Sequence, residues 1–178
     1  MTRAQLEHLI RAAADIADDT DIVVIGSQAV LGQFPDAPAS MRVSAEADLY
    51  PLHHPERADL IDGSIGELSP FHSTYNYYAQ GVSETTATLP PGWKDRLIVV
   101  QNANTRQARG LCLEVHDLLA SKALAGREKD IDFISEAAKH RMADKNILLF
   151  RLAAVDADTV AIESAQALVR RHFPDEVR

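Results

Sequence analysis

The hydrophobic positions change spacing along the chain and predict both helices and strands. Over residues 2–17, apolar side chains recur every three or four positions, which predicts an amphipathic helix that ends in the acidic segment 18–21. The continuous apolar run from Ile22 to Ile25 then predicts a short buried strand. This strand leads into Gly26-Ser27 and a helix through Leu31, so a strand, a tight turn of small residues and a helix follow one another.

The same pattern predicts further elements downstream. Strands are expected at 44–52, near 84–89, within 95–101 and at 110–115, and helices at 55–68, from 116 to about 140, and twice within 145–173. Consecutive strands lack regular crossover helices, so we expect an α/β (α+β) fold with a mixed sheet flanked by helices. The predicted domain covers residues 1–140, and residues 141–178 form a C-terminal helical extension packed on it.

Composition narrows the class of protein. The 178 residues suit one domain with a small appendage, and the net charge of -8 gives no overall basic surface for nucleic acid. Cys112 is the single cysteine, which excludes a disulfide framework and a cysteine-based zinc site. The N-terminus lacks the apolar segment of a secretory signal, and no window approaches the roughly 20 apolar residues of a membrane span. We therefore expect a cytoplasmic protein without membrane contact.

Two carboxylates share one face of the strand predicted at 44–52. Side chains alternate along a strand, so Glu46 and Asp48 lie on one face while Ala47 and Leu49 occupy the other. The two acids are only about 6–7 Å apart along the strand, which is costly unless they face water or a cation. Mg²⁺ takes oxygen ligands and leaves positions for phosphates, so the pair is a plausible half of a metal site. A solvated strand face explains the pair equally well.

Two other segments carry candidate chemistry. The Gly26-Ser27 turn follows a strand and opens a helix, where exposed backbone N–H groups can approach an anion, although Gly-Ser also forms ordinary turns. On the strand at 110–115, Glu114 shares a face with Cys112, and a third acid on a neighbouring strand would complete a two-metal site. An exposed or ion-paired glutamate is the alternative.

The helix that starts at His116 adds charged residues close to apolar positions. Lys122 emerges from the apolar side, where it either snorkels to water or reaches a phosphate. Arg127 and Asp130 form an i,i+3 pair, and Asp130 leans inward because Phe133 and Ile134 follow it at i+3 and i+4.

Taken together, these motifs resemble the nucleotidyltransferases of the DNA polymerase β superfamily. The residues that match the entry pattern of that superfamily are an apolar strand followed by "GSQA" and, about twenty residues later, a strand that carries "EAD". The later segment "LEVHDLLASKALAGREKDIDFI" resembles the helix of the minimal and AbiEii-like nucleotidyltransferases. Many members of that group are toxins of toxin–antitoxin pairs. The segment "YYAQGVSETTATLPPGWKDRLIVV" is similar to an uncharacterised nucleotidyltransferase-like group. The resemblance covers roughly residues 20–135.

The resemblance implies a role for each matched residue. Gly26 and Ser27 would hold the triphosphate of an NTP, and Glu46 and Asp48 would bind Mg²⁺. The further roles are Glu114 as the third acid, Lys122 as a phosphate contact, and Arg127 and Asp130 as residues that order the helix or the nucleotide. The first acid of the family is usually Asp, so Glu46 is a departure by one methylene.

The activity implied is transfer of NMP from an NTP to a hydroxyl of RNA, such as a tRNA end, or of a protein. The chain would then act as a toxin with an antitoxin partner. The alternative is a catalytically weak relative that binds a nucleotide or a partner, which the longer Glu46 and the acidic total favour. A metal-dependent hydrolase that uses the same acids has little support, because no ligand spacing of histidine and aspartate stands out. His53 and His54 follow the acidic strand and could contribute, but exposed loop histidines are the simpler interpretation of them. Tyr75, Tyr77 and Tyr78 either stack a base or, in the simpler interpretation, pack in the core.

Overall fold

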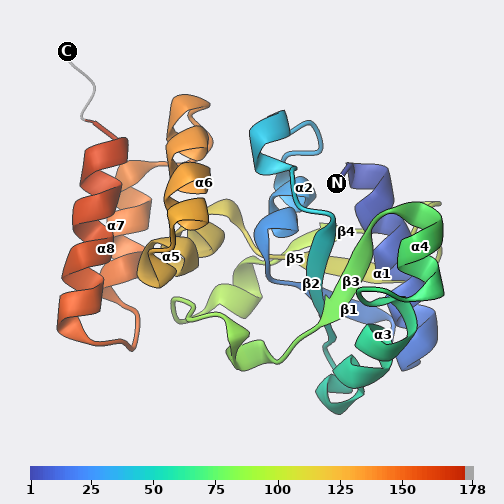
Figure 1. Ribbon diagram of the computed structural model, residues 1–178. Coiled ribbons are helices and arrows are strands. Elements are labelled where there is room, and N and C mark those ends of the chain that lie inside the picture. Colours follow the sequence, from blue (N-terminus) through green and yellow to red (C-terminus); the bar gives the residue numbers. More distant parts are fainter. Residues whose placement is uncertain (175–178) are drawn as a thin grey trace. The chain divides into compact units, whose positions relative to one another are not determined.

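A computed structural model describes residues 1–174 of the chain (Figure 1). Its strands are β1 (Asp21–Val24), β2 (Glu46–Pro51), β3 (Tyr78–Gly81), β4 (Ile98–Val100) and β5 (Arg109–Cys112). Its helices are α1 (Arg3–Ala17), α2 (Val30–Gln33), α3 (Ala58–Ile65), α4 (Pro70–Tyr75), α5 (Val115–Ala125), α6 (Glu128–Lys139), α7 (Lys145–Ala153) and α8 (Thr159–His172). No helix among these residues is both long enough and apolar enough to cross a membrane.

The chain packs into two compact units. One contains residues 1–86 and 96–114, and the other contains residues 87–95 and the described residues from Val115 onward. The predicted domain boundary near residue 140 stays a prediction.

The first unit is built on a mixed five-stranded sheet of order β3-β2-β1-β5-β4. β1 pairs with β2 antiparallel and with β5 in parallel, β2 pairs with β3 in parallel, and β4 pairs with β5 antiparallel. The predicted α/β class with a mixed sheet is therefore confirmed, and within the segment expected to form the C-terminal helical extension the described residues form α7 and α8.

Helices α1, α2 and α3 cover one face of this sheet. A Cβ on Gly110 of β5 would lie 2.3 Å from Cδ1 of Ile10, so the Ile10 side chain of α1 packs directly on the backbone of β5. A Cβ on Gly32 of α2 would lie 2.4 Å from Cβ of Cys112 in β5, and a Cβ on Gly81 of β3 would lie 1.9 Å from the carbonyl oxygen of Ala58 in α3. Because Cys112, Val24 and Leu49 are paired across three strands, their side chains share this helix-covered face. Asp48, one residue from Leu49, belongs to the opposite face.

Local sequence explains where α1 begins and ends. The side chain of Thr2 accepts the N–H of Gln5, and the Gln5 side chain accepts the N–H of Thr2, which forms a capping box. The helix ends at Ala17, and Asp18 adopts a left-handed conformation with φ of 49°. The helix predicted over residues 2–17 is confirmed.

Two of the predicted elements are wrong. The strand expected near 84–89 is absent from the described residues: 84–86 form a 3-10 turn, and the third strand is β3 at Tyr78–Gly81. The single helix expected from 116 to about 140 is instead α5 and α6, because Gly126 adopts a φ of 60° that ends α5. Residues 126–130 contain no apolar side chain, and such a charged segment is equally compatible with the exposed face of a continuous helix.

The second unit contains four helices. α5 packs against α6, α7 and α8, and α8 also contacts α6 and α7. Figure 1 shows these helices in yellow-brown to red. α7 and α8 each begin at an aspartate N-cap, Asp144 and Asp158, whose carboxylates accept two backbone N–H groups.

Candidate active site at the end of β1

The end of β1 and the start of β2 lie side by side. Val24 is paired with Leu49, and the N–H of Ile25 donates to the carbonyl of Asp48 at 3.1 Å. The turn that follows β1 therefore begins beside the acids of β2. This register brings the predicted Gly26-Ser27 turn and the predicted acids to the same edge of the sheet.

Gly26 is in direct contact with the side chain of Asp48. A Cβ at position 26 would lie 1.7 Å from Oδ2 of Asp48 and 2.7 Å from its carboxyl carbon. Such distances exclude any side chain at position 26 while the carboxylate keeps its position. The glycine is thus required because its backbone and the Asp48 carboxylate occupy adjacent space.

The turn after Gly26 is tight. Residues Ser27–Ala29 form a 3-10 turn in which the N–H of Ala29 donates to the carbonyl of Gly26 at 2.9 Å. Gln28 is buried beneath this turn, and its amide donates to the carbonyl of Met41 at 3.5 Å. The buried amide fixes the turn to the segment that precedes β2.

Glu46 lies at the start of β2 on the same face as Asp48. Both acids are half-buried, whereas Ala47 and Leu49 between and after them are buried, as alternation predicts. The backbone of Glu46 is bonded to the hydroxyl of Ser44 through both its N–H and its carbonyl. The carboxylate itself accepts a hydrogen bond from the hydroxyl of Tyr78, which lies 2.8 Å from Oε2.

Tyr78 is a site residue whose role the sequence does not predict. It pairs with Glu46 across β2 and β3, and this register depends on contacts between segments 32 residues apart. Burial, followed by the hydrogen bond to Glu46, raises the pKa of Tyr78 to about 12. The hydroxyl is therefore a protonated donor at neutral pH.

Glu114 follows β5 by two residues. The N–H of Leu113 still donates to the carbonyl of Val24 at 3.1 Å, which brings the chain to the same edge of the sheet as Gly26. Cys112, however, belongs to the face covered by α1 and α2, and Glu114 has the same alternation as Cys112. The pleat of β5 does not by itself bring Glu114 to the acids of β2, so its role as a third acid stays a prediction.

Among residues 1–174, no group of three or more histidine, cysteine, aspartate or glutamate side chains is arranged to hold a metal ion. Glu46 and Asp48 are two oxygen-donor side chains on one strand face. Mg²⁺ is often held by one or two carboxylates together with substrate phosphates, so this donor set fits it.

The predicted cationic residues belong to the helical unit, where Asp130 joins them. Its fully buried carboxylate accepts from Nζ of Lys122 at 2.9 Å and from Nε of Arg127 at 2.6 Å. Lys122 is also buried, and its ammonium lies 4.5 Å from the centre of the Phe133 ring. The predicted inward orientation of Asp130 is confirmed.

Charges and burial act on this pair in opposite directions. Burial alone would raise the pKa of Asp130, but the hydrogen bonds from Arg127 and Lys122 lower it below its usual value. Burial lowers the pKa of Lys122, and Asp130 opposes that effect. The arrangement fixes the start of α6 to α5, and the phosphate contact of Lys122 stays a prediction.

His53 lies at the other end of β1. Its Nε2 is 3.1 Å from the carboxylate of Asp21, the first residue of β1, and Arg109 also donates to that carboxylate, with Nε 2.6 Å from Oδ1. Hydrogen bonds from Arg109 hold the pKa of Asp21 below its usual value. This cluster joins the starts of β1 and β5, so His53 is separated from Gly26 by the length of β1.

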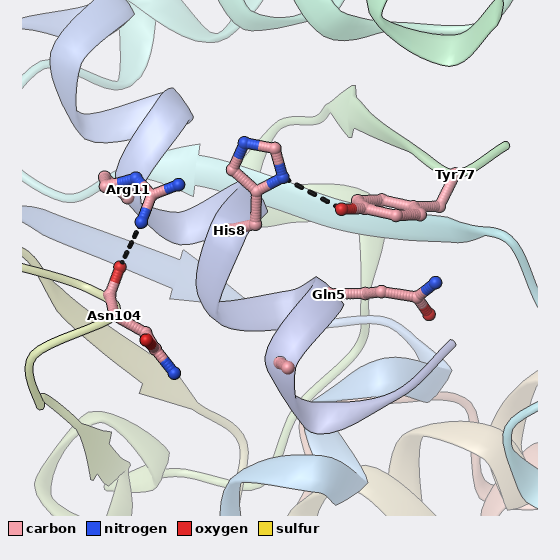
Figure 2. A pocket seen from close by; sticks show the side chains of 6 residues that line it. Gln5, His8, Arg11, Tyr77 and Asn104 are labelled. Carbon is pink, nitrogen blue, oxygen red and sulfur yellow. Dashed lines mark hydrogen bonds between the residues drawn. The ribbon is translucent and has the colours of Figure 1, made fainter. Parts of the chain in front are cut away.

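A groove of about 300 Å³ crosses the outer surface of α1 (Figure 2). It is lined by Ala4, Gln5, His8, Arg11, Tyr77 and Asn104. His8 and Tyr77 share a hydrogen bond of 2.8 Å, and Arg11 donates to the carbonyl of Asn104 at 2.7 Å, as the dashed lines in Figure 2 show. These two bonds join α1 to neighbouring segments. Tyr77 is buried and packs on Phe71 and Tyr75, which supports the packing interpretation for Tyr77, whereas Tyr75 is 45% exposed.

Comparison with known proteins agrees with this arrangement. A family model described as "Nucleotidyltransferase of unknown function (DUF6036)" matches residues 4–174. The chain therefore belongs to this nucleotidyltransferase-like family. No curated protein and no solved structure matches it. The AbiEii-like group suggested by the sequence stays a prediction.

Proposed function

We propose that the chain is an Mg²⁺-dependent nucleotidyltransferase that transfers NMP from an NTP to a hydroxyl group of RNA or protein. The observation that carries this proposal is the contact of Gly26 with the carboxylate of Asp48 at the end of β1. Membership of the nucleotidyltransferase-like family supports the same reaction class.

The glycine supports the proposed site because only a residue without a side chain lets the backbone of this turn lie directly beside the Asp48 carboxylate. A side chain at position 26 would occupy the space next to Asp48 Oδ2. In the proposed site, the triphosphate approaches the backbone of Gly26 and Ser27, and its nearness to the carboxylates calls for a cation between them. Gly26 and Ser27 bind and orient the phosphates, while Asp48 and Glu46 hold the metal.

When held by Asp48 and Glu46, Mg²⁺ would neutralise the negative charge of the phosphate oxygens and would stabilise the attacking and leaving oxygens of an in-line transfer. The chain contributes mainly by positioning, since phosphoryl chemistry requires little covalent participation from the protein. Glu114 is proposed as the third acid, which assists deprotonation of the acceptor hydroxyl. Lys122 is proposed to contact a phosphate, and Arg127 and Asp130 to order the helix that carries it.

The acceptor belongs to the same proposal. A short RNA end, such as that of a tRNA, or a protein hydroxyl is compatible with a chain of net charge -8, whereas a long nucleic acid would require a basic surface. A toxin that is inhibited by an antitoxin partner is the biological role proposed for this activity.

A nucleotide- or partner-binding module is the second candidate function. The observation that favours it is Glu46, whose side chain is one methylene longer than the aspartate that the resemblance implies for the first metal ligand. Such a protein would bind Mg²⁺ and NTP and transfer nothing.

Calorimetric titration with each of the four NTPs tests the site that both candidates share. We expect the wild type to bind at least one NTP with Mg²⁺ and to lose most of that affinity in EDTA. Asp48→Asn should weaken binding on the order of 100-fold, because the metal loses a charged ligand. Asp59→Asn provides the matched control, since Asp59 is exposed on α3. Equal affinity of Asp48→Asn and wild type would exclude this site.

A further inference from the structure

The hydroxyl of Tyr78 and the carboxylate of Glu46 form a direct link between neighbouring strands. The two residues are paired in the parallel β2–β3 ladder, and the N–H of Tyr78 donates to the carbonyl of Ala45 at 3.0 Å. The tyrosine is therefore fixed at the backbone beside the residue that precedes Glu46. Paired side chains emerge on the same face, and the hydroxyl reaches Oε2 of Glu46 at 2.8 Å.

Glu46 is held at two points. Ser44 bonds to its backbone N–H at 3.0 Å and to its carbonyl at 3.1 Å, which fixes the base of the side chain. Tyr78 holds the far end. A glutamate has one more rotatable bond than the aspartate two residues later on the same face, so its carboxylate requires an additional restraint to keep one position.

The tyrosine is itself restrained. Its ring lies 4.6 Å from the ring of His72, measured between centroids. An ionised carboxylate has no proton to donate, so the Tyr78 hydroxyl is the donor in this bond and Glu46 is the acceptor. Such a charge-assisted hydrogen bond is stronger than one between neutral groups.

We propose that Tyr78 is a positioning residue of the metal site: its hydroxyl fixes the carboxylate of Glu46 so that this longer side chain presents an oxygen to the cation together with Asp48. This inference rests on the proposed function, in which Glu46 and Asp48 hold the metal. Tyr78 acts through Glu46 and does not bind the metal or the nucleotide.

Binding of Mn²⁺, a paramagnetic substitute for Mg²⁺, measures this effect without any requirement for turnover. The free ion is counted by electron paramagnetic resonance during titration of the full chain in the presence of the NTP that binds best. We expect Tyr78→Phe to raise the half-saturating Mn²⁺ concentration about ten- to 100-fold, the usual effect of removing a residue that orients a metal ligand. The variant keeps the ring and its contact with His72.

Tyr77→Phe is the matched control. It removes a hydroxyl from the adjacent tyrosine, whose bond is to His8 on α1 and not to an acid of the site. We expect its Mn²⁺ titration to match that of the wild type. An equal weakening in both variants would overturn the positioning role, because general loosening of β3 would then explain the effect.

A double-mutant cycle separates positioning from structure. In a Glu46→Ala background, Tyr78→Phe should cause no further loss of Mn²⁺ affinity, because the group that Tyr78 positions is absent. Additive losses would overturn the proposal. A wild type that binds Mn²⁺ and a Tyr78→Phe variant that binds it equally well would overturn this inference alone, whereas a wild type that binds no Mn²⁺ would overturn the proposed function and this inference with it.

Discussion

Gly26 and the carboxylate of Asp48 are so close that a methyl group on Gly26 would lie 1.7 Å from Oδ2. We expect Gly26→Ala to displace the Asp48 side chain while β1 and β2 remain paired. Misplacement of reacting groups by about 1 Å can cost on the order of 100-fold in rate, so we expect a loss of activity of that size and weaker binding of NTP with Mg²⁺, while the chain still unfolds cooperatively. Transfer of label from an α-labelled NTP, calorimetric titration and urea unfolding of the same variant measure activity, binding and stability.

Gly63 provides the control for this substitution. It lies inside α3, and a Cβ there would meet no atom within 4 Å. Gly63→Ala should leave NTP binding unchanged and raise the free energy of unfolding by about 0.5–1 kcal/mol, because alanine favours a helix over glycine. Equal losses of NTP binding in the two glycine variants would contradict the explanation.

Asp130 is the shared acceptor of two cations in the helical unit. Asp130→Ala would leave Lys122, whose side chain is only 8% exposed, without this counter-charge, and we expect a loss of about 3–5 kcal/mol in the free energy of unfolding. Lys122→Met should cost less, because Asp130 keeps Arg127. Urea unfolding of both variants checks the order, and a larger loss in Lys122→Met would contradict it.

Asp21 makes stability depend on pH. Hydrogen bonds from Arg109 lower the pKa of Asp21 in the folded protein, so its contribution is present above the unfolded value of about 3.9 and is lost as the pH falls through the lower folded value. We expect Asp21→Asn to lower the free energy of unfolding by about 1.5 kcal/mol at neutral pH, a modest figure because Arg109 is 48% exposed. The gap between variant and wild type should narrow as the pH falls below the unfolded value and close once the pH is below the lowered pKa of the folded protein. A gap that is constant with pH would mean that the ionised carboxylate is not its source.

Cys112 should be unreactive in the folded protein. It is fully buried, and burial raises the pKa of its thiol to about 12, so very little thiolate is present at neutral pH. We expect a disulfide reagent such as DTNB to react with it only when the chain unfolds in denaturant. Rapid labelling of the native protein would contradict the burial of this residue beneath α2.

The sequence predicts the elements better than it predicts the contacts between them. The helical spacing of residues 2–17 and the alternation around Ala47 define α1 and the acidic face of β2, because both depend on local periodicity. The break at Gly126 is not specified by the hydrophobic pattern alone, because the charged segment 126–130 fits the exposed face of one long helix as well as a boundary between two helices.

Pairing between distant segments explains what the sequence leaves open in the site. The contact of Gly26 with Asp48 requires the register of β1 and β2, and the bond from Tyr78 to Glu46 requires that of β2 and β3. Spacing along the chain does not predict which residues of two distant strands are paired. The motif therefore suggests the acids and the glycine, while Tyr78 is apparent only when the strands are paired.

Transfer of label from each of the four α-labelled NTPs into total cellular RNA and protein tests the central claim most directly. The reaction is run with Mg²⁺ and the wild type beside Asp48→Asn and the exposed control Asp59→Asn. We expect label in one acceptor class with the wild type and with Asp59→Asn, and no label with Asp48→Asn. The labelled NTP that gives this signal would also identify the nucleotide. The absence of label with the wild type, or an equal amount with Asp48→Asn, would contradict nucleotidyl transfer at the end of β1.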